Sequence, residues 1–415
     1  MAEETTIELK RAALNHYFQN LNTPQQQAVF HVNGPVLVLA GAGSGKTTAM
    51  IHRIVQMIHF GDGWVQANAS ITKEDAAYLK DYIADKQPAD LERLCSILAV
   101  QPIQPWHILA ITFTNKAANE LRNRLLQAIG EECASMLHAS TFHSACVRIL
   151  RRSISKLGYD SNFTIYDTDD SQRLMKSCIA DADVSEKQFP PRAVLTEISL
   201  AKDRMCSPEY FCIEAGSDYR KMVIGKLYKE YQNRLKSANA LDFDDLIYKT
   251  VELLESFPEE LEYYQNRFRY IMVDEYQDTN HAQFRLVQLL SQKHQNLCVV
   301  GDDDQSIYRF RGATIENILN FEKQFQNAVV IRLEQNYRST KTILKAANDV
   351  IAHNAGRKEK TLWTDLEDGK KIIWYKAVDE TDESRFVAEK IEKEVQNGAS
   401  YQDFAVLYRM NAQSN

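Results

Sequence analysis

The sequence lacks several features that would assign it to a special class of protein. No apolar run approaches the ~20 residues that a membrane-spanning helix needs, and the first residues, Met1–Glu4, are acidic and polar, unlike a secretory signal. The seven cysteines are scattered and include no C-x-x-C pair, which indicates neither a zinc site nor a disulfide framework. We therefore expect a cytoplasmic globular protein that makes no contact with a membrane.

An excess of basic residues is also missing, since the formal net charge is −7. A generally basic surface for polyanions is thereby excluded, although a local basic groove is still sufficient to bind nucleic acid. The remaining composition, with 44% hydrophobic and 25% charged residues, is that of a chain able to bury a sizeable core.

Short apolar runs alternate with segments of helical periodicity. The runs that we predict as strands lie at residues 36–39, 108–111, 270–273, 297–300 and 329–333. Strands that alternate with helices favour an α/β fold with a parallel sheet covered on both faces, in which ligands bind beyond the carboxyl ends of the strands.

Two segments interrupt this alternation. Residues 61–104 are polar and helix-prone and are interpreted as an insertion, whereas residues 153–241 are charged and predict a separate all-helical subdomain. After residue 333 a second α/β segment begins, with predicted strands at 371–375 and 404–408.

The first strand leads into a glycine-rich loop and then a helix. The segment comprises Ala40, Gly41, Ala42, Gly43, Ser44, Gly45, Lys46 and Thr47. Backbone N–H groups of such a loop surround phosphate oxygens, and the helix N-terminus adds a favourable dipole. In this setting Lys46 is predicted to reach the β- and γ-phosphates of a nucleotide, and Thr47 to hold Mg²⁺.

Two acidic segments follow later strands. Asp274 suits a role in holding Mg²⁺, and Glu275 suits a general base for the attacking water. Downstream, Gln305 is placed to sense the γ-phosphate. Tyr308, Phe310 and Arg311 interleave aromatic and basic groups as single-stranded nucleic-acid sites do, although taken alone Tyr308 and Phe310 are more typical of a core.

Further candidates lie in loops after other strands. Phe113, Asn115 and His143 are candidates for nucleic-acid contact. Arg338 is a candidate arginine finger, and Tyr337 is a candidate for stacking on adenine. Near the start of the chain, the amide of Gln25 is predicted to read the adenine edge.

The order of these motifs resembles that of the superfamily 1 DNA helicases of the UvrD/Rep/PcrA group. The matching segments are AGAGSGKT (40–47), ITFTNKAA (111–118), STFHS (140–144), LDFDDL (241–246), VDEYQDTN (273–280), GDDDQSIYRFRGA (301–313) and LEQNYRST (333–340), together with Gln25. The resemblance implies an ATP- and Mg²⁺-dependent 3′→5′ helicase acting on single-stranded DNA and on single/double-strand junctions. It implies no particular protein partner.

The resemblance also implies a domain plan and site roles. A RecA-like domain 1A is expected at 1–152 and 242–333, helical subdomain 1B at 153–241, and the first part of a second RecA-like domain, 2A, at 334–415. By motif position, Lys46, Asp274, Glu275, Gln305 and Arg338 inherit catalytic roles, while Tyr337 and the loop through Thr48 inherit nucleotide binding. Thr48 stands where many relatives carry Arg, and Phe310 where close relatives have Trp.

The family continues beyond residue 415, so we expect a chain truncated within domain 2A. Two alternatives are a fragment that binds nucleotide and DNA without unwinding, and an unrelated P-loop ATPase such as a recombinase or transporter motor.

Overall fold

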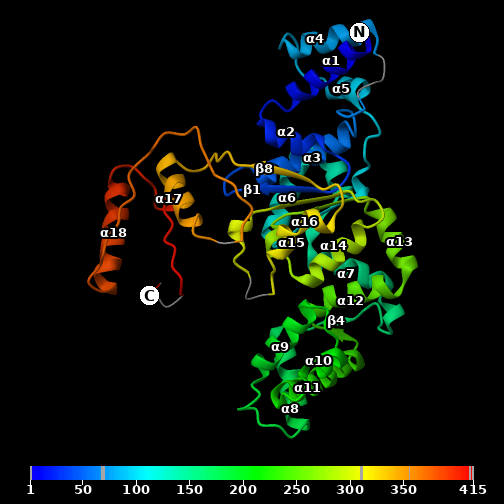
Figure 1. Cartoon of the computed structure of the whole chain (residues 1–415), viewed down its shortest axis with the longest axis vertical. Helices are drawn as coiled ribbons and strands as arrows, with labels where there is room; N and C mark the ends of the chain where they lie inside the picture. The colour runs from blue at the N-terminus through cyan, green and yellow to red at the C-terminus, as the bar shows by residue number, and fades with distance from the viewer. Residues whose placement is uncertain (1, 67–70, 309–311, 355, 411–412, 414–415) are drawn as a thin grey trace.

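The computed structural model describes residues 2–66, 71–308, 312–354, 356–410 and 413. At its centre is a sheet of six strands that are all parallel, in the order β3-β2-β6-β7-β1-β8 (Figure 1). The strands are β1 (Val36–Ala40), β2 (Ile108–Thr112), β3 (His138–Thr141), β6 (Tyr270–Val273), β7 (Leu297–Gly301) and β8 (Val329–Leu333). The predicted α/β fold with a parallel sheet is confirmed.

Alternate residues of the strands feed two different cores. Val36 and Val38 of β1 belong to the first core, whereas Leu37 and Leu39 belong to the second. Among the helices that contribute to the first core are α2 (Thr23–Phe30), α3 (Lys46–His59) and α6 (Asn115–Met136). Among those that contribute to the second are α7 (Phe142–Ser153), α12 (Phe243–Ser256), α13 (Pro258–Arg267) and α14 (His281–Ser291). Both faces are therefore covered, as the apolar strand runs require.

One strand of this sheet was not predicted. β3 pairs with β2 from Leu109↔His138 to Thr112↔Thr141 and forms an edge of the sheet. Its sequence, His-Ala-Ser-Thr, contains no apolar run, although Ala139, Ser140 and Thr141 are buried. Hydrogen bonding to β2, rather than side-chain pattern, makes this segment a strand.

A separate helical cluster occupies the lower end of the molecule in Figure 1. It contains α8 (Thr168–Asp181), α9 (Pro191–Asp203), α10 (Pro208–Ala215) and α11 (Tyr219–Ser237), packed around a core of their own. Short strands β4 (Thr164–Ile165) and β5 (Ala240–Leu241) pair beside it. Buried Lys202 joins the cluster to α12, with Nζ at 2.6 Å from Asp242 Oδ2 and 2.9 Å from Asp245 Oδ1.

The segment interpreted as an insertion forms two helices at the opposite end of the molecule. They are α4 (Lys73–Ile83) and α5 (Leu91–Leu98), and α4 packs on α1 (Ala2–Tyr17) (Figure 1). Within the described part of the chain, no helix is both long and apolar enough to cross a membrane.

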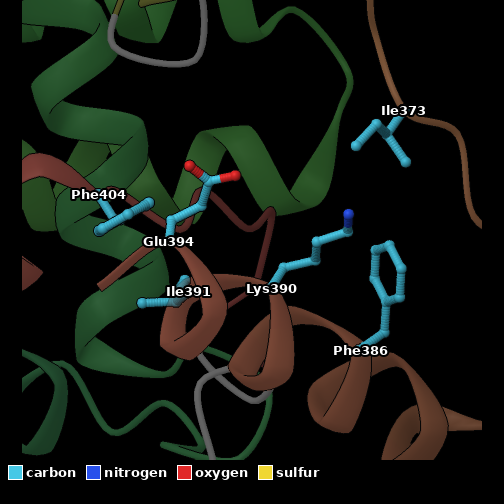
Figure 2. Close-up of a pocket in the computed structure, with 6 residues that line it drawn as sticks. All are labelled: Ile373, Phe386, Lys390, Ile391, Glu394 and Phe404. Atoms are coloured by element: carbon cyan, nitrogen blue, oxygen red, sulfur yellow. The ribbon is translucent and has the colours of Figure 1, made fainter. Parts of the chain in front are cut away.

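After β7 the chain forms α15 (Glu316–Leu319) and α16 (Phe321–Gln324), and after β8 it forms α17 (Lys341–Ile351) and α18 (Glu380–Gln396). The predicted strands at 371–375 and 404–408 are wrong, because neither segment is paired in a ladder. A strand depends on a neighbour for its backbone hydrogen bonds, and the described residues bring none alongside. Instead, Ile373 and Phe404 line an open apolar pocket with Phe386 and Ile391 of α18 (Figure 2).

Candidate nucleotide and nucleic-acid site

The phosphate loop connects β1 to α3 at the carboxyl edge of the sheet. Gly43 and Gly45 have φ angles of 67° and 82°, in the left-handed region that favours glycine. Ser44 Oγ donates to the Gly41 carbonyl at 2.7 Å, which closes the turn. α3 then begins at Lys46, so its free N–H groups face the loop. This is the strand–loop–helix geometry expected of a phosphate site.

The neighbouring strands bring the other candidates to the loop. β1 lies between β7 and β8, with β6 beyond β7, so the segments that follow these strands share one edge. Lys46 Nζ lies 3.8 Å from Glu275 Oε2 and 4.0 Å from Asp302 Oδ2. Both separations exceed those of hydrogen-bonded ion pairs, ~2.8 Å. The Lys46 ammonium is thus held among carboxylates by charge, without a close bond that fixes it.

Asp274 and Glu275 end β6 in different environments. Asp274 is buried, and burial together with the adjacent Glu275 carboxylate raises the pKa of Asp274 to about 6. Glu275 is partly exposed and has a φ of 49°, which is unusual for a residue with a side chain. The Glu275 carboxylate lies toward Lys46. A cation beside Asp274 would stabilise the ionised form of its carboxyl.

Gln277 lies within the VDEYQDTN segment, but the motif alone predicts no role for it. Its buried amide links two acidic segments, because Nε2 donates to Glu275 Oε2 at 2.8 Å and Oε1 accepts from the Asp302 N–H at 2.9 Å. The signal in the sequence was weak, since a glutamine in a short helical turn is usually a solvated side chain. Gln277 fixes Glu275 relative to the loop after β7.

Gln305 is exposed, and its Nε2 donates to Asp302 Oδ2 at 2.5 Å. Asp302 is buried, and its carboxylate is also near Lys46. The amide predicted to sense the γ-phosphate is therefore attached to the same carboxylate that attracts the phosphate-loop lysine.

The segment that follows β8 lies on the phosphate loop. Asn336 Nδ2 donates to the Ala42 carbonyl at 2.6 Å, and the Tyr337 N–H donates to the Gly43 carbonyl at 3.0 Å. A Cβ placed on Gly43 would lie 2.9 Å from Arg338 Cβ. Asn336, a residue that the sequence motifs did not single out, thus brings Tyr337 and Arg338 to the loop.

Two residues predicted to bind nucleotide have partners within the protein. The Gln25 amide is buried, with Nε2 donating to the Ser44 carbonyl and Oε1 accepting from the Asn22 N–H. Thr48 Oγ1 accepts from Arg124 Nη2 at 3.0 Å. A guanidinium group from α6 therefore lies beside the first turn of α3, although residue 48 itself is threonine.

The nucleic-acid candidates lie near the carboxyl ends of β2 and β3. Phe113 contacts Phe142 edge-on, Asn115 is exposed at the start of α6, and His143 stacks on Phe243 at 4.0 Å. Burial lowers the pKa of His143 to about 4, which leaves the ring neutral at physiological pH. The exposed ring of Phe243, within the LDFDDL motif, is an aromatic surface that sequence reasoning did not single out.

Tyr308 is partly exposed in the loop after β7. The predicted contacts Phe310 and Arg311 lie outside the described residues.

Comparison with known proteins places these motifs in one family. A family model described as the UvrD/REP helicase N-terminal domain matches residues 21–68 and 91–326, and a UvrD-like helicase C-terminal domain model matches 331–415. The chain is 47% identical over 403 residues to the ATP-dependent DNA helicase PcrA of Staphylococcus aureus strain Mu50, covering 97% of this chain and 49% of that protein.

A PcrA helicase of Staphylococcus epidermidis strain ATCC 12228 is 46% identical over 401 residues, again with 97% and 49% of the two chains covered. The chain thus spans about half the length of the curated relatives it matches.

Proposed function

The chain belongs to the UvrD/REP helicase family, and from that membership we propose that it is an ATP-driven motor that moves 3′→5′ along single-stranded DNA and separates strands at single/double-strand junctions. One observation carries the ATP part of this proposal. The phosphate loop, the acidic end of β6, the acidic loop after β7 and the segment after β8 meet around Lys46.

Phosphate binding falls to the loop and Lys46. The N–H groups of the loop and of the first turn of α3 donate hydrogen bonds to the phosphate oxygens, because the helix begins at Lys46 and leaves these donors unpaired within the helix. The Lys46 ammonium, held at 3.8 Å and 4.0 Å from its carboxylates, is available to turn to the β- and γ-oxygens.

Thr47 and Asp274 fit a Mg²⁺ site by their chemistry. Hydroxyl and carboxylate oxygens are ligands that Mg²⁺ accepts, and a cation beside Asp274 would offset the burial and the adjacent Glu275 charge that raise the pKa of its carboxyl. When bound with ATP, Mg²⁺ supplies neutralisation of the β- and γ-oxygens. Asp274 and Thr47 then fix the orientation of the nucleotide.

Glu275 is the proposed general base. It is partly exposed to the space beside Lys46, and its Oε2 accepts from Gln277 Nε2, which orients the carboxylate. A carboxylate that is held but still accessible can take a proton from water as water attacks the γ-phosphate. Gln305 and Arg338 approach the same phosphate from the loops after β7 and β8 and are proposed to sense it.

Adenine is proposed to lie between Tyr337 and the region of Gln25. The Tyr337 hydroxyl accepts from Asn22 Nδ2 at 2.9 Å, which positions the half-exposed ring next to α2. Gln25 already bonds to Ser44, so reading of the adenine edge requires its amide to exchange or share these partners.

DNA is proposed to cross the aromatic side chains at the carboxyl ends of β2 and β3. Phe113, His143 and Phe243 supply ring faces and edges, and neutral His143 stacks without adding charge. Asn115, Tyr308, Phe310 and Arg311 extend this proposed contact surface by motif position.

The helical cluster with its separate core supports the assignment of 153–241 as subdomain 1B. Residues 1–152 and 242–333 are then domain 1A, and 334–415 belong to domain 2A.

The test compares the purified chain with its Lys46→Ala and Glu275→Gln variants. We expect Lys46→Ala to lose nucleotide binding and hydrolysis together, because it removes the phosphate-directed charge. Glu275→Gln should bind ATP but hydrolyse it at least about 100-fold more slowly, as loss of a general base predicts. Undiminished turnover in either variant would refute the assigned roles.

A further inference from the structure

Lys360 lies buried inside a run of three acidic side chains. Its Nζ is 2.8 Å from Asp302 Oδ1 and 2.7 Å from Asp304 Oδ2, and it also pairs with Asp303 Oδ1. The lysine side chain is 2% exposed. No sequence motif singled out Lys360, which lies 56 residues beyond Asp304 in the chain.

The three carboxylates have the arrangement of a cation site. Among the described residues, their ligand atoms form the one group of three or more close enough to hold a metal ion. The Lys360 ammonium bonds to all three, so the positive charge that this cluster needs comes from the chain itself. Buried carboxylates are tolerated only with such compensation.

The Lys360 ammonium is connected to the nucleotide site through one side chain, Asp302. Asp302 faces Lys360 with Oδ1, while its Oδ2 accepts from Gln305 Nε2 and lies 4.0 Å from Lys46 Nζ. A single carboxylate therefore connects Lys360, the phosphate-loop lysine and the amide that approaches the γ-phosphate.

The segment that carries Lys360 also touches the phosphate loop. A Cβ placed on Gly41 would lie 2.1 Å from Leu362 Cδ2, and the Lys358 N–H donates to Asp303 Oδ2 at 2.7 Å. Residues 357–362 thus contact both the acidic run, through Lys358, and the phosphate loop, through Leu362. A displacement of this segment would move Asp302.

We propose that Lys360 is a positioning residue of the nucleotide site, whose ammonium takes the place of a metal ion among Asp302, Asp303 and Asp304 and thereby holds Gln305 toward the γ-phosphate. The inference rests on the proposed function of Gln305. Lys360 then affects the preference of the site for ATP over ADP, because only ATP has the γ-phosphate that Gln305 is proposed to contact.

The experiment compares Lys360→Met with Lys358→Met. Lys358 is the matched control, because it lies in the same segment but its side chain pairs with Glu322, outside the acidic run. Affinities for fluorescent analogues of ATP and ADP are titrated in Mg²⁺ buffer without Ca²⁺, because Mg²⁺ keeps several of its waters and does not readily enter an all-protein carboxylate site. In Lys360→Met the preference for ATP over ADP should fall at least about tenfold, as loss of a charge-assisted hydrogen bond predicts, with ADP affinity little changed.

A second measurement tests the cation directly. Without the ammonium, the three carboxylates should accept a divalent ion, so millimolar Ca²⁺ should raise the melting temperature of Lys360→Met by several degrees more than that of wild type or Lys358→Met. If Lys360→Met does not fold, the Asp303→Asn/Lys360→Met double variant restores the wild-type charge of the cluster and is tested for nucleotide preference alone.

Retention of the wild-type preference for ATP in the folded Lys360 variant would overturn the proposal, and so would an equal loss in Lys358→Met. A wild-type chain that binds both nucleotides but does not hydrolyse ATP would count against the proposed function instead, and the Ca²⁺ response would still test the place of the ammonium.

Discussion

Asn336 offers the sharpest test of how the segment after β8 completes the phosphate site. Its buried amide makes three hydrogen bonds, from Nδ2 to the Ala42 carbonyl at 2.6 Å and from the Arg338 and Ser339 N–H groups to Oδ1 at 2.8 Å and 2.7 Å. At a net ~1 kcal/mol each, removal of all three in Asn336→Ala costs about 2–4 kcal/mol of stability.

Asn336→Ala should also weaken nucleotide binding. The hydrogen bond from Asn336 Nδ2 to the Ala42 carbonyl attaches the segment that carries Arg338 to the loop. Loss of this bond, at about 1–1.4 kcal/mol, corresponds to a five- to tenfold weaker affinity for ATP. Titration with a fluorescent ATP analogue measures this change, and thermal denaturation of the same sample measures the stability. Asn336→Asp keeps both accepting bonds but loses the donor, so it should weaken ATP binding at least as much.

Asn296→Ala is the matched control. Its Oδ1 accepts from the Gly34 N–H at 3.0 Å at the amino end of the sheet, away from the site. It should lower the melting temperature without weakening ATP binding. If Asn336→Ala also lowers the melting temperature without weakening ATP binding, the hydrogen bond from Asn336 to the phosphate loop does not contribute to nucleotide affinity.

Two further predictions concern buried polar groups. Gln277→Leu removes the hydrogen bond to Glu275 and should lower the ATP turnover rate about tenfold or more, while ATP affinity stays within about threefold. Steady-state kinetics and titration measure the two quantities. An equal loss in both would contradict an orienting role for Gln277. Burial and the nearby Asp244 raise the pKa of Asp203 to about 7, so the wild type loses stability as the pH rises from about 4 through 7. Asp203→Asn should therefore gain up to about 4 kcal/mol over wild type at pH 8, with the gain vanishing near pH 4 in urea denaturation; a gain independent of pH would rule out this titration.

The contiguous parts of the site were predictable from sequence. The glycines of the phosphate loop, Lys46 and the acidic pair at 274–275 carry their chemistry within a few residues, next to strands that an apolar run identifies. Gln277 and Asn336 were not predicted as functional, because their roles depend on which backbone groups the sheet order brings beside them. Lys360 was missed for the same reason, since its three partners come from a distant loop.

The fold shows the same division. Five strands of the sheet are indicated by apolar runs, whereas β3 has no such run and is a strand only through pairing with β2. Conversely, residues 371–375 and 404–408 have apolar strand-like patterns but no ladder partner among the described residues. Pattern predicts which face a segment can bury, and pairing decides whether it becomes a strand.

We propose that DNA contact and ATP hydrolysis are coupled in this chain. The most direct measurement is the steady-state rate of ATP hydrolysis with and without a single-stranded oligonucleotide, at fixed salt because phosphate contacts depend on it. We predict a rate that rises severalfold with DNA in wild type and stays at background with Lys46→Ala. If the wild-type chain binds the oligonucleotide but its hydrolysis rate does not change, DNA contact and ATP hydrolysis are not coupled.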